Sequence, residues 1–340
     1  MAQITAVKPY AALDRTQVLL IAVALVAALL LPLVAGPFWI ALVTQMLIFG
    51  LLALSVDLLL GHAGLFSLCH AAFFAVAAYT TAILQVRYGV STAAAAPAGV
   101  LMGTLLGLVF GLAVRTRGVY FILVTIAMGY VVWGVAYRWA SFTGGDNGVT
   151  NVPRPAVGGL SIETTNGYYY FMVVVVLLCT LGYRVLINSP FGLTLRGIKT
   201  SESRMRSVGY RTNLHLYAAF VISALLASFA GVLYVYYNRF INPVAASFPI
   251  SVEAALMAIV GGTGTIIGPF IGSAVVLSLR NWVSSFFELH HAAMGVVFIA
   301  TVLWAPHGIV GLFARGRRAW TERRSANAAA PVPRAGQREP

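Results

Sequence analysis

A series of apolar runs, each close to the length of a membrane-spanning helix, constrains the fold of this chain more than any other feature. About 20 apolar residues in a helix span the hydrocarbon core of a bilayer. A membrane barrel would instead show segments of about ten residues with alternating polarity. The runs therefore predict an all-α, polytopic membrane helical bundle. The expected spans are residues 18–35, 38–60, 63–84, 93–114, 119–139, 168–187, 214–237, 266–283 and 292–313, with a short apolar stretch at 252–260.

Composition supports this class. Of the 340 residues, 60% are hydrophobic and 9% are charged, whereas a soluble domain carries roughly 25% charged residues. We expect about ten membrane segments if the short stretch counts as one. The first run leads into Gly36-Pro37 and another apolar run, so we do not interpret it as a cleavable signal peptide.

The basic residues predict the orientation, because cytoplasmic loops are enriched in Lys and Arg. With the N-terminus in the cytoplasm, 17 of the 22 basic residues fall on the cytoplasmic side. Both termini are then cytoplasmic. Residues 1–17 form an N-terminal segment, 18–314 the transmembrane domain and 315–340 a basic, disordered tail; residues 140–167 form an external loop and 188–213 a cytoplasmic loop.

The sequence carries no signature of an enzyme. Neither of its lysines, Lys8 and Lys199, stands in a G-x-x-x-x-G-K-[ST] phosphate loop, and H-E-x-x-H, G-x-S-x-G and C-x-x-C patterns do not occur in it. His62 and His70 are eight residues apart and could share a helical face, but no cysteine or carboxylate cluster accompanies them. We therefore predict no catalytic residue, no metal site and no cofactor in this chain. The net charge of +13 is explained by membrane topology and anionic lipid rather than by nucleic acid.

Two glycine-rich interruptions divide apolar runs. The first is Gly61-His62-Ala63-Gly64, shortly after Asp57, and the second is "VGGTGTIIGPFIGS" from Val260, after Glu253. Non-helical backbone at membrane depth is tolerated where it is buried in protein or lines a wet cavity, and paired breaks in two halves of a transporter often mark its pathway. Tight helix packing through small residues is the alternative.

The cytoplasmic loop "NSPFGLTLRGIKTSESRMRSVGYRTN", residues 188–213, is longer than an ordinary helix connection. Ser189-Pro190 is typical of a helix start, with proline at the first helical position. The loop is basic and predicted to be partly helical, ending at Gly209. It is either an amphipathic helix on the lipid surface or a coupling element that docks onto a cytosolic partner.

Four stretches resemble the inner-membrane permeases of branched-chain amino acid ABC transporters, of the LivM type. They begin "GHAGLFSLCHAAFF" at Gly61, "RTRGVYFILVTIAMG" at Arg115, "FTGGDNGVTNVP" at Phe142 and "GGTGTIIGPFIGS" at Gly261. The resemblance implies a multi-pass protein of the bacterial inner membrane, with residues 140–167 in the periplasm. It also implies several partners: a second, related permease, two ATP-binding subunits that hydrolyse ATP, and a periplasmic solute-binding protein.

The resemblance and the breaks together assign two sets of candidate residues. The translocation pathway is expected to include Gly61, His62, Gly64, Ser67, His70, Gly261, Gly262, Gly264 and Gly268. Coupling to the ATPase is expected to involve Ser189, Phe191, Gly192, Arg196, Glu202 and Gly209. Lys199 stands where the family commonly has arginine, and Arg204 and Arg206 stand in a segment usually richer in alanine.

Two other functions are open to a chain of this composition. An ion-coupled secondary transporter of small organic solutes would share the broken helices, but it would need no coupling loop and would usually place an ionisable residue at mid-membrane. A membrane-embedded enzyme would have to use Asp57, His62 or His70, and a second cluster at matching depth does not occur in the sequence.

Overall fold

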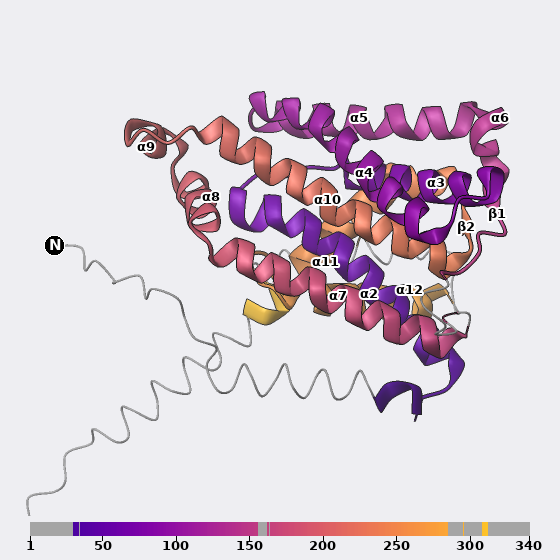
Figure 1. Cartoon of the computed structure of the whole chain (residues 1–340). Helices are drawn as coiled ribbons and strands as arrows, with labels where there is room; N and C mark the ends of the chain where they lie inside the picture. The colour runs from indigo at the N-terminus through magenta and orange to yellow at the C-terminus, as the bar shows by residue number, and fades with distance from the viewer. Residues whose placement is uncertain are drawn as a thin grey trace, which may run out of the picture.

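The computed structural model describes residues 30–33, 35–155, 162, 164–284, 295 and 308–311, and it is mostly helical (Figure 1). Among these residues, five helices are long and apolar enough to cross a membrane. They are α2 (Pro37–Asp57) continued by the π-helical turn η1 (Leu58–Ala63), α4 (Thr92–Phe110) continued by the 3-10 turn η2 (Gly111–Arg115), α5 (Val119–Arg138), α7 (Thr165–Asn188) and α10 (Thr212–Asn238).

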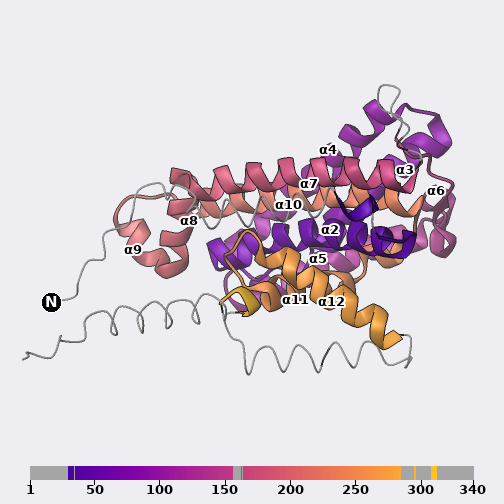
Figure 2. The ribbon, with the colours of Figure 1, turned by 90° about the horizontal axis from the view of Figure 1, so that it is seen from below.

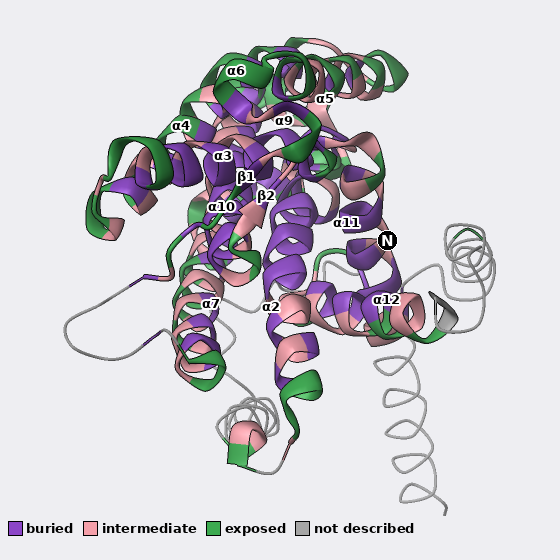
Figure 3. Ribbon diagram, turned by 90° about the vertical axis from the view of Figure 1, so that its right-hand side faces the viewer, coloured by how far each residue is buried: buried purple, intermediate pink, exposed green. Residues whose placement is uncertain are grey.

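Helices α2 and α10 form the centre of the bundle, and both are largely buried (Figure 3). Helix α3 (His70–Tyr88) packs against both α4 and α10. Helix α5 lies at the periphery and exposes most of its apolar surface (Figure 3). Apolar side chains on the outside of a bundle suit a hydrocarbon surrounding, so the burial pattern agrees with the predicted membrane class.

The two polar connections lie at opposite ends of the bundle (Figure 1). One end carries α8 (Pro190–Thr200) and α9 (Glu202–Ser207). The other carries α6 (Ala140–Thr143), the 3-10 turns η3 (Gly145–Asn147) and η4 (Pro243–Ala246), and the strands β1 (Val149–Thr150) and β2 (Phe240–Ile241). The strands pair antiparallel, with Val149 opposite Ile241. The described parts of the loops 140–167 and 188–213 thus lie at opposite ends of the bundle (Figure 1), which is compatible with the predicted orientation.

The short apolar stretch expected at 252–260 lies within α11 (Phe248–Gly261), and the expected span 266–283 corresponds to α12 (Gly268–Ser284). The two helices pack against each other and against α2 (Figure 2). Helix α11 has 14 residues, fewer than the roughly 20 that a full crossing needs.

The helix expected at 63–84 begins later than predicted. Gly64 adopts a left-handed conformation with φ 74°, and residues 65–69 are not helical, so α3 starts at His70. Residues 65–69 are mostly apolar, like the helix that follows them, which is why the sequence placed the start too early. His62 and His70 therefore do not share a helical face, and that expectation is wrong.

Helix α8 confirms the start predicted at Ser189-Pro190: Ser189 is the extended N-cap and Pro190 the first helical residue. The loop 188–213 is partly helical, as expected, but the helical part is divided into α8 and α9, and Gly209 follows α9 with φ 95°.

Four glycines at four-residue spacing line one face of the α4–η2 segment: Gly99, Gly103, Gly107 and Gly111. A β-carbon at any of them would press on α3 or α10. At Gly103, for example, it would meet the Ser228 hydroxyl and lie 2.9 Å from the Phe73 carbonyl oxygen. The stripe lets α4 pack backbone-to-backbone against its neighbours, as small residues do in membrane helices.

Most of the expected spans 18–35 and 292–313 lies outside the described residues, as do the N-terminal segment 1–17 and the tail 315–340. The number of membrane segments therefore stays a prediction.

Candidate functional site

The first glycine break is a change of helix type followed by a short non-helical segment. Helix α2 ends at Asp57, the π turn η1 carries the chain to Ala63, and Gly64 reverses the backbone with a positive φ. The N–H of Leu65 then donates to the Leu59 carbonyl at 2.9 Å. π-helical turns inside α-helices are rare and often occur at functional sites.

The second break lies in the turn between α11 and α12, and it meets the first. Gly262 and Gly264 have φ 120° and 77°. The N–H of Gly264 donates to Asp57 Oδ1 at 2.7 Å, across 207 residues of sequence. A β-carbon on Gly61 would lie 2.8 Å from the Gly264 α-carbon, so glycine is needed there for the two backbones to approach.

Asp57 is also bound from a third helix. The hydroxyl of Tyr183 in α7 donates to Asp57 Oδ2 at 3.1 Å, and the same hydroxyl lies 3.3 Å from His62 Nδ1. Because the hydroxyl has one proton, His62 must supply the hydrogen for the second contact from Nδ1. All three side chains are buried, and Asp57 is fully so. We call Asp57, Gly61, His62, Tyr183 and Gly264 the junction.

Helix α8 reaches the junction through one side chain. Lys199 Nζ donates to the Gly61 carbonyl oxygen at 2.7 Å, although Lys199 as a whole is exposed. A cation is favourable at this place, because carbonyl groups at the end of a helix carry partial negative charge.

Backbone N–H groups of the segment 65–69 and of the first turn of α3 donate hydrogen bonds to side chains of other helices. Thr125 Oγ1 in α5 accepts from the Leu68 N–H at 3.2 Å, and Ser251 Oγ in α11 accepts from the Ala71 N–H at 3.0 Å. These hydroxyls satisfy backbone groups that would otherwise be costly in an apolar surrounding. Sequence reasoning missed both, because single hydroxyl residues on apolar helices carry no signal of their distant partners.

His70 and Ser67 lie apart from the junction. His70 Nε2 is 2.7 Å from Ser223 Oγ in α10, whose hydroxyl donates to the Ser55 carbonyl at 2.5 Å. Ser67 is 3.3 Å from the sulfur of Cys69. These side chains are buried and tie the start of α3 to α10 and α2.

The remaining glycines predicted for the pathway divide by environment. Gly64 and Gly264 are exposed and have positive φ, whereas Gly261 and Gly268 are buried against each other. A β-carbon on Gly261 would meet the Gly268 carbonyl. The close contact between Gly261 and Gly268 is typical of helix packing through small residues.

The residues predicted for coupling cluster on α8 and α9. Arg196 donates to the Ile187 carbonyl at 3.2 Å, and a β-carbon on Gly192 would clash with the Ile187 backbone, so both fix α8 to the end of α7. An open cleft of about 700 Å³ lies between α8, α9 and the start of α10. Its lining includes Phe191, Arg196, Met205, Tyr210 and His215.

Glu202 is engaged within the chain. Its Oε1 accepts from Arg117 and Arg206 at 2.7 Å each and from Thr212 at 3.1 Å, and Arg117 also contacts Asn213. Partial burial raises the pKa of Glu202, but the hydrogen bonds from these three residues outweigh it, and the net pKa is lowered. Glu202 thus fastens α9 to the segment before α5.

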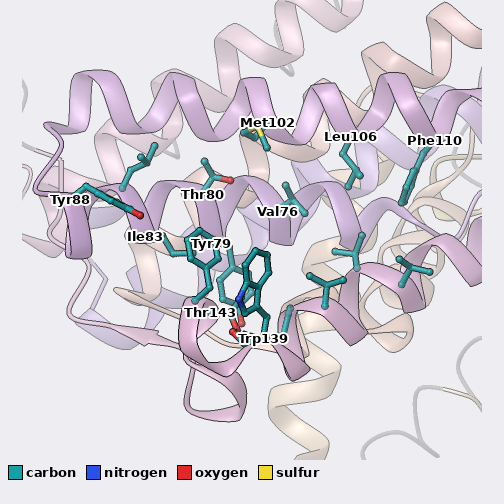
Figure 4. Close-up of a pocket in the computed structure, with 16 residues that line it drawn as sticks. Val76, Tyr79, Thr80, Ile83, Tyr88, Met102, Leu106, Phe110, Trp139 and Thr143 are labelled. Atoms are coloured by element: carbon teal, nitrogen blue, oxygen red, sulfur yellow. Dashed lines mark hydrogen bonds between the residues drawn. The ribbon is translucent and has the colours of Figure 1, made fainter.

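A separate apolar pocket of about 490 Å³ opens between α3, α4 and α5 (Figure 4). Tyr79, Met102 and Trp139 are among its lining residues, and none of the 16 is charged. It therefore offers no countercharge to a zwitterionic solute. Within the described part of the chain no group of three His, Cys, Asp or Glu residues could hold a metal ion, and the two cysteines are free.

Comparisons with known proteins agree on one family. A family profile described as "branched-chain amino acid transport system / permease component" matches residues 38–303. The high-affinity branched-chain amino acid transport system permease protein LivM of Escherichia coli (strain K12) is 27% identical over 312 residues, covering 83% of this chain and 73% of the relative. The protein of the same name from Salmonella typhimurium is 26% identical with the same coverage. No solved structure matches. Because the profile spans most of the sequence, the chain belongs to the family of branched-chain amino acid transport permeases.

Proposed function

We propose that this chain is the membrane-spanning permease subunit of an ABC importer for branched-chain or related amino acids in the bacterial inner membrane. One observation supports it beyond the family match: two glycine breaks, far apart in sequence, meet inside a helical bundle beside a buried carboxylate. Broken helices whose ends meet in this way are typical of transporters and have no evident use in a structural membrane protein.

In this proposal the loop 188–213 and both termini are cytoplasmic, and the loop 140–167 is periplasmic. The chain contributes about ten membrane segments, and the junction together with Gly64, Ser67 and His70 borders the pathway. Alternating access would require the contacts at the two breaks to rearrange, including the hydrogen bonds of Asp57 with Tyr183 and Gly264.

Four partners are part of the proposal. A second, related permease would complete the pathway, two ATP-binding subunits would dock on α8 and α9, and a periplasmic solute-binding protein would deliver the solute. ATP would be hydrolysed in those subunits, so this chain needs no cofactor. The cleft beside α8, with Phe191 and Arg196 at its wall, is the concave surface that this docking would use.

Topology is tested by labelling single cysteines in intact cells. Asn147 is exposed in η3, so Asn147→Cys should react with an impermeant maleimide from outside, while Ser203→Cys in α9 should react only after lysis. The unsubstituted protein, whose Cys69 is buried, gives the background. Labelling of Asn147→Cys only after lysis would reverse the orientation.

Transport is tested with the complete complex in proteoliposomes. ATP inside the vesicles should drive uptake of leucine, isoleucine or valine in the presence of the binding protein, and a protonophore should leave the initial rate unchanged. The ion-coupled alternative, which the family membership does not favour, requires the opposite: uptake by this chain without ATPase subunits. A shift in the melting temperature of the binding protein on adding each solute would identify the substrate.

A further inference from the structure

The contact between Lys199 and Gly61 joins two parts of the molecule that the proposed function assigns to different tasks. Lys199 lies in the last turn of α8, on the arm that extends from the bundle, and Gly61 lies in the π turn of the first break (Figure 1). Their hydrogen bond of 2.7 Å is part-buried and runs from an ammonium group to a backbone carbonyl. Hydrogen bonds to charged groups are among the stronger ones in proteins.

Helix α8 is a rigid support for this contact. Its apolar face, with Leu195 and Ile198, is buried, and the helix packs on α7 and on η1. The lysine stem runs alongside the left-handed glycine: a β-carbon on Gly64 would lie 3.0 Å from Lys199 Cγ. A displacement of α8 therefore moves the Lys199 side chain directly against the first break.

The first break is in turn fastened to the second. Asp57, at the start of the π turn, holds the Gly264 N–H, and the Gly61 carbonyl held by Lys199 lies four residues further along the same turn. The contacts thus form a continuous series from Lys199 to Gly61, through the turn to Asp57, and on to Gly264. Each step is a discrete contact that is either made or broken, which is what a two-state coupling element requires.

From this geometry we infer that Lys199 is a positioning residue that couples movement of α8 to the opening of the two helix breaks. The inference rests on the proposed function, in which ATPase subunits move α8. When Lys199 holds the Gly61 carbonyl, the π turn and the Gly264 turn stay together. When α8 shifts, the ammonium group leaves the carbonyl and the junction is free to rearrange.

The experiment uses the complete complex in proteoliposomes and compares Lys199→Met with Lys199→Arg. Methionine keeps the unbranched stem beside Gly64 but cannot donate to Gly61, whereas arginine keeps a donor. Arg115→Met, an exposed residue at the end of η2 and outside the proposed docking helices, is the matched control for loss of one positive charge. Solute-stimulated ATP hydrolysis and ATP-driven uptake are measured on the same vesicles, together with the amount of ATPase bound per permease.

We expect the ATP hydrolysed per solute imported to rise about tenfold in Lys199→Met, since a charged hydrogen bond is worth roughly that factor in an equilibrium. Lys199→Arg and Arg115→Met should stay within about twofold of the unsubstituted complex, well inside that factor. An unchanged ratio in Lys199→Met, or loss of bound ATPase from it, would overturn the inference, because Lys199 would then be dispensable or a docking residue. A proportional fall in complex yield, hydrolysis and uptake that arginine does not reverse would also overturn it. Failure of the unsubstituted complex to import with ATP would instead reject the proposed function.

Discussion

Two glycine-rich regions of this protein need glycine for different physical reasons. The stripe on the α4–η2 segment, Gly99 to Gly111, consists of glycines in helical conformation whose neighbours leave no room for a side chain. At the breaks, Gly64 and Gly264 have a backbone conformation that other residues rarely adopt, and a β-carbon at Gly264 would find ordinary space, 3.4 Å from the nearest atom. Glycine is therefore required for close packing along the stripe and for backbone conformation at Gly64 and Gly264.

The difference indicates which region is built to move. Backbone-to-backbone packing along several turns is close and apolar, and it resists change because interiors pack at crystal-like density. The junction is held by a few hydrogen bonds among Asp57, Tyr183, His62 and Gly264, each of which can break separately. In the proposed function, the α4 stripe would be a fixed part of the bundle and the junction would be the part that rearranges.

The largest expected effect breaks the stripe. Gly103→Leu would drive a side chain into the Phe73 carbonyl and the Ser228 hydroxyl, and because one of these is backbone, the cost should reach about 3 kcal/mol or more. We expect a large loss of purified protein and of melting temperature. Gly182→Leu in α7, where a β-carbon meets nothing within 4 Å, is the matched control and should behave as the unsubstituted protein. Equal stability of the two variants would refute the packing role of the stripe.

A second variant removes the acceptor at the centre of the junction. Asp57→Ala leaves the Gly264 N–H and the Tyr183 hydroxyl without their carboxylate. An unpaired buried donor costs about 1–3 kcal/mol, which applies to the buried Tyr183 hydroxyl, whereas the N–H of the exposed Gly264 should add less. Asp57→Asn keeps an oxygen for Gly264 and should be destabilised less. Melting temperatures in detergent measure both, and an Asp57→Ala protein as stable as the unsubstituted one would show that these contacts do not hold the breaks together.

A third test compares alanine with asparagine at one glycine of each region. The more stable of the two substitutions should differ between Gly264 and Gly107. At Gly264 a left-handed alanine costs about 1–2 kcal/mol, while asparagine adopts that conformation more readily. At Gly107, where the backbone is helical and the Ala224 side chain faces it, the smaller alanine should be tolerated better than asparagine.

The melting temperatures of Gly264→Ala, Gly264→Asn, Gly107→Ala and Gly107→Asn test this expected reversal. Asparagine should be the more stable substitution at position 264, and alanine at position 107. If alanine is better at both positions, conformation does not explain the glycine at the break.

Some features of the fold and of the junction were predictable from the sequence, and others were not. It predicted the glycine breaks, the helix start at Ser189-Pro190 and the opposite placement of the two polar loops, because these depend on local residue types and on charge. The α4 stripe was visible as glycines every four residues, a known packing pattern, and sequence reasoning overlooked it. The meeting of Asp57 with Gly264 and Tyr183 was not predictable from one sequence, because contacts across 207 and 126 residues leave no local periodicity.

The smallest expected effect concerns the polar contacts of Glu202 at the water-exposed end of the bundle. Polar contacts there should contribute less to the free energy of unfolding than the buried ones at the junction. The Glu202 side chain is 27% exposed and its partner Arg206 is 56% exposed, and exposed ion pairs contribute about 0–1 kcal/mol. Because the pKa of Glu202 is lowered in the folded protein, its contribution is present above the unfolded pKa, near 4.3, and is lost as the pH falls through the folded value. Glu202→Gln should therefore be slightly less stable than the unsubstituted protein at pH 7, and the difference should shrink below pH 4. Melting temperatures at the two pH values, repeated at high salt, check this; a difference as large as that of Asp57→Ala would mean that exposure does not weaken these contacts.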